Sequence, residues 1–428
     1  MGQAGTRRSR RSPRRWVVPP GLRQAGEPFE GFAVVDELRN GLGLLLWQSL
    51  RDVDLWSATP PEERTMLFAA GAAERRRVEL ATLPEAGPVQ SPLLAIAWLL
   101  EEGEGRMPDL SESCLAVSRW AIGQGHRRTA LAFGEAAAVA APMDAGAAYW
   151  VGYLSRRAAD YRRAETWYRR AIGLARRTDD WKSYGMAYCG WANLMIQRGD
   201  YPAARDKLLV ALRAARRHGL WSIKPLALHD LCCIAIHDGN TDEVTSYARR
   251  AFRAYGRRHP RVVALAHDVA FFWMLQGYFA PALRVFRAVA GYVTDHPHRL
   301  LAQSSVARAA GGVGDRFSYN EAWADTWRLI DATHDTEKVA EALVNLAHGA
   351  ASIGDRDRAT IAAGQALTVA LQRSEAEQRE AAESLLNALR RAEPVSPYPR
   401  PAGAPPAQAA DALSSELAEV LTMSNMEV

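Results

Sequence analysis

Three side chains able to bind a metal ion follow one another at intervals of four residues: His229, Cys233 and His237. This spacing places them on one face of an α-helix, and imidazole and thiolate groups are ligands that Zn²⁺ prefers. His237 would, however, lie about 12 Å along the helix from His229, too far for one ion. A two-ligand site completed by His267 is the alternative. We expect instead a polar surface that binds no metal and no other cofactor.

Motifs of the common catalytic classes are missing from the sequence. It contains no GxxxxGKS/T phosphate-binding loop, no HExxH zinc pair and no GxSxG nucleophile elbow. The glycine-rich stretch 311–314 has no predicted strand before it, so we expect it at a turn between helices rather than around a phosphate. We therefore predict that the protein is not an enzyme.

The elements that carry these residues are predicted to be helices, because the chain repeats itself from about residue 111 onward. The turn Asp160-Tyr161 recurs 40 residues later as Asp200-Tyr201. In both copies a small residue, a bulky residue and an alanine then follow at intervals of four and three residues. Further copies follow turns at 238–240, 276–278 and 354–355. A fixed period of this length predicts stacked helical hairpins, since one hairpin cannot bury its apolar face alone.

The repeat pattern resembles the tetratricopeptide repeat family. Its best copy has small and aromatic residues at the positions Ala148, Gly152, Tyr161, Ala164, Tyr168 and Ala171. The spacing of 38–40 residues exceeds the usual 34 and is similar to the longer repeats in sensor arms of bacterial multidomain regulators. The resemblance implies an all-α fold, a right-handed α-solenoid over residues 111–373. Small residues would let helices approach to about 8–10 Å, while the bulky residue fills the space toward the next hairpin.

The resemblance also implies a concave groove, because in tetratricopeptide arrays the first helices of successive hairpins line the side where partners bind. The residues predicted to line it are Tyr149, Tyr153, Arg156, Arg157, Asn193, Gln197, His229, Cys233, His237, His267 and Phe271. Aromatic anchors with hydrogen-bonding neighbours suit a protein or peptide ligand. The alternative is that individual members pack between hairpins. The lysine and asparagine clamp for chaperone C-terminal carboxylates is not matched, because Tyr149 and Tyr153 occupy its first two positions.

Arginines are dense on the predicted second helices, which the resemblance places mainly on the convex side. They are Arg162, Arg163, Arg169, Arg170, Arg176, Arg177, Arg213, Arg216, Arg217, Arg249, Arg250, Arg253, Arg257 and Arg258. The simplest interpretation is a solvated face. The alternative functions are contact with an acidic protein segment, or a basic solenoid that binds nucleic acid through these arginines and the N-terminal tail.

Composition divides the rest of the chain. Residues 1–23 carry seven arginines and no acidic residue, which predicts a disordered tail. Residues 24–110 form a helical segment that either stands apart or contains degenerate repeats. Residues 374–393 form a helix with glutamates on one side, typical of a cap on a solenoid. Residues 394–428 are a Pro/Ala linker and a short amphipathic helix that either docks or frays.

The overall composition favours a soluble folded protein. Hydrophobic residues make up 48% of the chain, charged residues 24%, and the net charge is +5. No apolar stretch is long enough to span a membrane, and four cysteines fit a reducing cytoplasm. We predict a cytoplasmic, non-catalytic scaffold or regulatory module that binds a protein or peptide. These patterns do not encode the partner's identity or the oligomeric state.

Overall fold

The computed structural model describes most of the chain: residues 32–102, 107–332, 338–373, 375–391, 393 and 407–426. Over these residues it is almost entirely helical and contains no β-strand, which confirms the all-α prediction. The predicted N-terminal tail (1–23) and the Pro/Ala linker (394–406) lie outside the described residues. Within the described residues, no helix combines the length and apolar character needed to cross a membrane.

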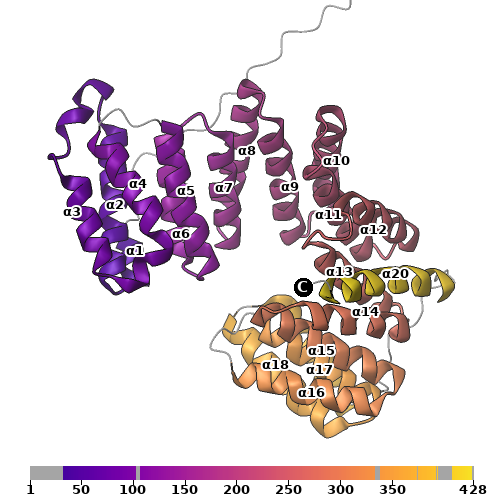
Figure 1. Ribbon diagram of the computed structural model, residues 1–428. Helices are drawn as coiled ribbons and strands as arrows, with labels where there is room; N and C mark the ends of the chain where they lie inside the picture. The colour runs from indigo at the N-terminus through magenta and orange to yellow at the C-terminus, as the bar shows by residue number, and fades with distance from the viewer. Residues whose placement is uncertain are drawn as a thin grey trace, which may run out of the picture. The chain divides into compact units, whose positions relative to one another are not determined.

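The helices fall into two compact units, residues 1–223 and 224–428 (Figure 1). The first unit contains α1 (Phe32–Glu37), α2 (Gly41–Ala58), η1 (Pro61–Met66), α3 (Ala72–Ala81), η2 (Pro84–Ala86), α4 (Gly87–Glu101), α5 (Met107–Gly123), α6 (Arg127–Ala140), α7 (Ala145–Arg157), α8 (Tyr161–Thr178), α9 (Trp181–Gln197) and α10 (Tyr201–His218). The second contains α11 (Ile223–His237), which begins at the boundary, α12 (Thr241–Tyr255), α13 (Val262–Leu275), α14 (Phe279–Tyr292), α15 (His296–Val313), α16 (Arg316–Asp331), α17 (Val339–Ser352), α18 (Arg356–Arg373), α19 (Ala376–Arg390) and α20 (Ala407–Met426).

Short turns join the helices into hairpins, and the recurring aspartates cap the helices that follow. Asp160 accepts a hydrogen bond from the backbone N–H of Arg163 at 3.0 Å, and Asp200 does the same for Ala203 at 3.1 Å. Each satisfies one of the free N–H groups in the first turn of its helix. The repeated Asp-Tyr pair in the sequence is therefore an N-cap followed by the first residue of a helix.

Successive hairpins interlock through one bulky side chain against small ones. Tyr168 on α8 is fully buried. A Cβ atom added to Gly152 on α7 would lie 2.8 Å from the Tyr168 ring, and one added to Gly190 on α9 would lie 2.5 Å from it. The ring therefore fills the space between its own hairpin and the next, as the repeat pattern predicted.

In several neighbouring hairpins the first helix, here called the A helix, packs on the A helix of the next. In the first unit α7 packs on α9, and in the second α15 packs on both α13 and α17. The second helices, here called B helices, do not pack on one another to this extent in the described part of the chain. Closer contact between A helices than between B helices is the arrangement expected on the inner side of a curved stack.

The N-terminal helices do not follow this simple pairing, but they are joined to the hairpins. Helix α2 packs on α6, and α4 packs on α5. Glu37 of α1 caps α6 by accepting from the backbone N–H groups of Arg128 and Thr129 at 3.2 and 2.8 Å. A carboxylate at this end of a helix also interacts favourably with the helix dipole.

The second unit ends with two helices of different roles. Helix α19 packs on α17 and α18 and exposes Glu377, Glu380 and Glu383. Helix α20 lies along α14 and α13 (Figure 1). Its buried face includes Leu413 and Leu417, and Arg284 of α14 donates to Asp411 at 2.8 Å. The amphipathic C-terminal segment is therefore docked on the second unit.

The glycines at 311–314 serve helix packing as well as a turn. Gly311 and Gly312 belong to α15, and only Gly314 takes the left-handed turn conformation (φ 84°). A Cβ atom on Gly311 would collide with the backbone of Gly349 on α17, and one on Gly312 would collide with the ring of Phe279. The stretch thus lies at the turn between α15 and α16, as expected, and two of its glycines also permit close helix contacts.

We predict that Gly190→Ala destabilises the protein by about 1–3 kcal/mol, because the added methyl group must displace the buried Tyr168 ring. Urea unfolding followed by circular dichroism measures this change. Gly364→Ala is the matched control, because a Cβ atom there meets nothing within 4 Å in the middle of α18. It should stabilise by about 0.5–1 kcal/mol through helix propensity. Equal effects of the two substitutions would contradict the interlock.

We also predict that Ala159→Gly stabilises the protein by about 0.5–1 kcal/mol. Ala159 has φ 61°, in the left-handed region that glycine adopts at the corresponding turn residue Gly199. Removing the strained Cβ outweighs the greater freedom of glycine in the unfolded chain. Ala158→Gly, at a residue with an ordinary φ of −83°, should instead destabilise, and thermal unfolding of both variants compares them directly.

Candidate functional site

Two neighbouring A helices of the first unit, α7 and α9, carry six of the predicted groove residues, here called the α7–α9 surface: Tyr149, Tyr153, Arg156, Arg157, Asn193 and Gln197. The rings of Tyr149 and Tyr153 lie 6.5 Å apart between centroids. Arg157 donates to the Tyr153 hydroxyl at 3.1 Å. The Arg156 guanidinium lies 5.7 Å from the Tyr153 ring centroid, within cation–π range. The structure thus brings four of the predicted groove residues together on α7.

The other two members lie on the adjacent A helix, α9. Asn193 is half-buried and donates its side-chain amide to the backbone carbonyl of Cys189 at 3.0 Å. Gln197 is exposed at the end of the helix. Tyr149 also packs toward the core, with its ring 6.2 Å from that of Tyr168. The surface is therefore rigid at its aromatic base and open to solvent at Arg157 and Gln197.

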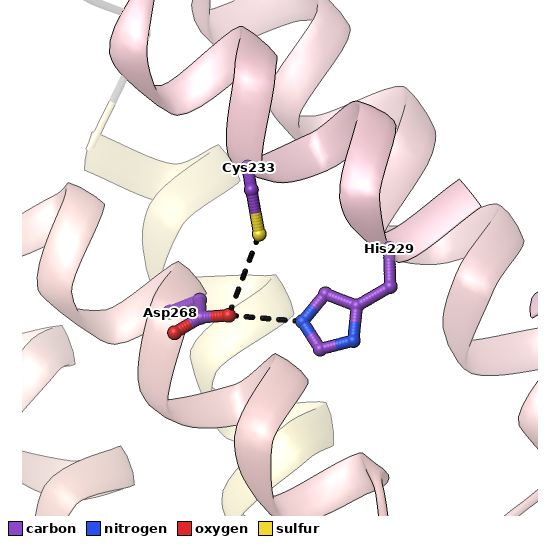
Figure 2. A group of neighbouring side chains, drawn as sticks. All are labelled: His229, Cys233 and Asp268. Atoms are coloured by element: carbon purple, nitrogen blue, oxygen red, sulfur yellow. Dashed lines mark hydrogen bonds and ion pairs between the residues drawn. The ribbon is translucent and has the colours of Figure 1, made fainter. Parts of the chain in front are cut away.

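The second unit carries a different site, formed by His229 and Cys233 on α11 and Asp268 on α13 (Figure 2). His229 Nε2 lies 2.9 Å from Asp268 Oδ2, and the Cys233 thiol lies 3.6 Å from the same oxygen. One donor atom from each residue lies within 4.8 Å of the others, so the three could hold a metal ion. His229 is buried, while the side chain of Asp268 is 37% exposed.

The electrostatics of this cluster favour a charged carboxylate and a neutral thiol. Burial opposes the charge on Asp268, but hydrogen bonds and charge interactions with His229 and His267 hold its pKa well below the usual range. Burial and the nearby carboxylates of Asp268 and Asp230 raise the pKa of Cys233 well above that of a free thiol. Cys233 is therefore not activated as a nucleophile.

Further polar contacts join the A helices α13, α15 and α17 of the second unit. His267 Nε2 lies 3.3 Å from the hydroxyl of Ser305 on α15. Arg308 of α15 is buried, donates to Asn345 Oδ1 on α17 at 3.1 Å and lies 5.8 Å from the ring centroid of Phe271. The predicted groove residues His267 and Phe271 thus belong to a network that links three A helices.

The spacing within α11 does not reveal Asp268, whereas the expectation that His237 lies too far from His229 to share an ion agrees with the structure. His237 is exposed at the C-terminal end of α11, so it does not join His229 and Cys233. His267, the predicted completing ligand, reaches Asp268 Oδ1 at 3.8 Å instead. Counting one repeat onward from His229 leads to the segment that holds both residues, so the repeat period contained the signal for Asp268. Counting onward from Asp268 by one and by two further hairpins leads in the same way to Arg308 and Asn345.

Several of the second-helix arginines are engaged in packing rather than forming a free basic face. Arg170 is buried and donates to the Pro142 carbonyl at 2.8 Å. Arg163 pairs with Glu135, and Arg169 pairs with Glu165. Arg213, Arg216 and Arg217 on α10 are exposed. The predicted convex stripe is therefore interrupted on α8.

We predict that His348 makes stability depend on pH. Burial and the nearby Arg308 lower its pKa from 6.5 to about 3. Below pH 6.5 the unfolded chain binds a proton that the folded chain does not, so stability falls by at most about 1.4 kcal/mol per pH unit as the pH decreases toward 3. His348→Gln should remove this component between pH 7.5 and 5 in urea unfolding. The exposed His298→Gln is the control, and an unchanged slope in His348→Gln would contradict the assignment.

No family model matches the sequence, and no protein with a curated description matches it. The structure resembles solved structures of tetratricopeptide repeat proteins. One, from Parabacteroides merdae ATCC 43184, is 15% identical, with a TM-score of 0.43 over 65% of this chain and 98% of its own. Another, a TPR2AB-domain:pHSP90-complex of yeast Sti1, is 12% identical, with a TM-score of 0.25 over 66% of this chain and 98% of its own. The contact of Tyr168 with Gly152 and Gly190 shows in this chain itself that successive hairpins interlock, and the fold is an all-α array of helical hairpins.

Proposed function

We propose that this protein is a non-catalytic scaffold or regulatory module that binds a protein or peptide segment on the inner side of its hairpin stack. The observation that carries the proposal is the α7–α9 surface, where Tyr153 is held half-exposed by stacking on Trp150 at 5.1 Å between ring centroids. Rigid, partly exposed aromatic rings flanked by arginines are the residue types that dominate binding energy at interfaces.

The arrangement supports a peptide with an apolar side chain next to an acidic group. The ligand's apolar side chain packs on the Tyr149 and Tyr153 rings, and Arg156 and Arg157 pair with its carboxylate. Because Arg157 is already held by the Tyr153 hydroxyl, less side-chain entropy is lost on binding. Asn193 on the adjacent helix supplies hydrogen bonds that orient the peptide backbone.

The length of the repeats supports a place among bacterial regulators, whose sensor arms have similarly long hairpins. Cys114, Cys189, Cys232 and Cys233 form no disulfide in the described part of the chain, which supports a reducing cytoplasmic setting. Nucleic-acid binding is the alternative, and the engagement of Arg163, Arg169 and Arg170 in local pairing weighs against it.

We predict that Tyr153→Ala combined with Asn193→Ala weakens peptide binding by at least about thirtyfold, since a truncated anchor residue costs about 2 kcal/mol or more. Peptides selected on the immobilised protein from a randomised display library serve as ligands, and fluorescence anisotropy measures their affinity. Helicity and thermal unfolding of the double variant should stay unchanged, because both side chains are partly exposed.

The matched control is Arg213→Ala combined with Arg217→Ala, on the exposed face of the B helix α10. It should leave peptide affinity unchanged. Equal affinity of the Tyr153/Asn193 variant would refute the α7–α9 surface. Oligonucleotide binding that falls steeply with salt and is weakened by the arginine control would favour the alternative function.

A further inference from the structure

We propose that His229, Cys233 and Asp268 form a binding site for one Zn²⁺ ion between α11 and α13. The three donor atoms come from two neighbouring hairpins and lie within 4.8 Å of one another. Figure 2 shows the imidazole and the thiol directed toward the same carboxylate. This site lies wholly within the second unit, so it stands independently of peptide binding by the α7–α9 surface.

Two of the three separations between donor atoms are close to those around a tetrahedral ion, and the third lies within 4.8 Å. Zn²⁺ binds imidazole nitrogen and carboxylate oxygen at about 2.0–2.2 Å and thiolate sulfur at about 2.3 Å, so neighbouring ligand atoms lie roughly 3.4–3.6 Å apart. The separation of 3.6 Å between Cys233 Sγ and Asp268 Oδ2 already matches. The separation of 2.9 Å between His229 Nε2 and Asp268 Oδ2 needs to open by about half an ångström, a small rotation of two side chains.

Two of the three ligands, His229 and Asp268, are oriented from behind by a second side chain. The Tyr255 hydroxyl lies 3.3 Å from His229 Nδ1 and leaves Nε2 directed at the site. The other oxygen of Asp268 lies 3.8 Å from His267 Nδ1, and His267 is in turn held by Ser305. A hydrogen bond to the far nitrogen of a metal-binding histidine fixes the ring and is a regular feature of zinc sites.

The charge of the cluster also suits a divalent cation. Among the described residues, Asp268 contacts His229, His267 and Cys233, none of which carries the permanent positive charge of a lysine or arginine. A carboxylate enclosed in this way lacks a permanent positive partner, which a metal ion supplies. A thiolate and an imidazole select Zn²⁺ over Mg²⁺ or Ca²⁺, which prefer oxygen ligands.

Three protein ligands leave a fourth position for water or an added ligand. The Asp268 side chain is 37% exposed, so the ion can enter from solvent and the fourth position faces outward. When Zn²⁺ binds, the Cys233 thiol gives up its proton to solvent and the resulting thiolate bonds to the ion. The ion then links two hairpins directly.

The experiment titrates the full-length protein, freed of metal with a chelator, with Co²⁺ and then with Zn²⁺. One equivalent of Co²⁺ should produce a thiolate-to-cobalt charge-transfer band and the visible bands of a tetrahedral ion, and one equivalent of Zn²⁺ should abolish both. Zn²⁺ should also raise the Tm of the wild-type protein. Absence of the charge-transfer band in the wild-type protein would overturn the proposal.

Variants separate the site from adventitious binding. Cys233→Ser should lose the charge-transfer band, and Asp268→Asn should weaken Zn²⁺ binding in competition with a chromophoric chelator. Cys232→Ala is the matched control, because Cys232 lies on the same helix, is fully buried and donates its thiol to the Val244 carbonyl. It should bind metal as the wild type does. If Cys233→Ser and Asp268→Asn both bind like the wild type, the proposal is wrong.

Tyr255→Phe tests the orienting hydrogen bond without changing a ligand. It should weaken Zn²⁺ binding by about tenfold to a hundredfold while the charge-transfer band persists at saturating Co²⁺. Helicity by circular dichroism shows whether each variant is folded. Should Cys233→Ser not fold, the Zn²⁺ affinity of Asp268→Asn compared with that of Cys232→Ala still decides the question, and equal affinities would overturn the proposal.

Discussion

The structure depends on one packing constraint, which is that a hairpin cannot complete its own core. The bulky residue of a B helix reaches the A helix of the next hairpin and must find a small residue there. Tyr168 meets Gly190 in this way. In the second unit Tyr319 of α16 lies against Gly349 of α17 in the same relation. A methyl group added at Gly190 or Gly349 would displace atoms of two hairpins at once, because close-packed interiors have no space for it.

This constraint explains what the sequence reveals. An interlock repeated along a stack requires the same residue types at a fixed period, so the turns at Asp160 and Asp200 and the small residues after them predict the hairpins. Asp268 is not revealed in this way, because the pattern at His229 and Cys233 points to imidazole and thiolate ligands, which His267 would complete, and not to the carboxylate beside it. The docking of α20 on α14 has no periodic signal, since it joins segments far apart in the chain.

The two units use the same architecture for different inner surfaces. On α7 the side chains are aromatic and basic and partly exposed, so a ligand can displace the water that covers them. In the second unit the corresponding side chains bond to one another across successive A helices. Buried polar groups are costly unless they are paired. The contacts of His267 with Ser305 and of Arg308 with Asn345 therefore fix the register between hairpins as well as satisfy the groups themselves.

The proposed zinc site lies at a contact between two hairpins. A stack gains stability mainly at the interfaces between neighbouring units, and the His229–Asp268 contact lies at such an interface. A hydrogen bond there contributes about 1 kcal/mol or somewhat more when charged. A metal ion held from both sides binds only when the two hairpins are in register, so its binding energy stabilises that register. A bound metal ion would thus stabilise the contact between α11 and α13, at the hairpin that begins the second unit.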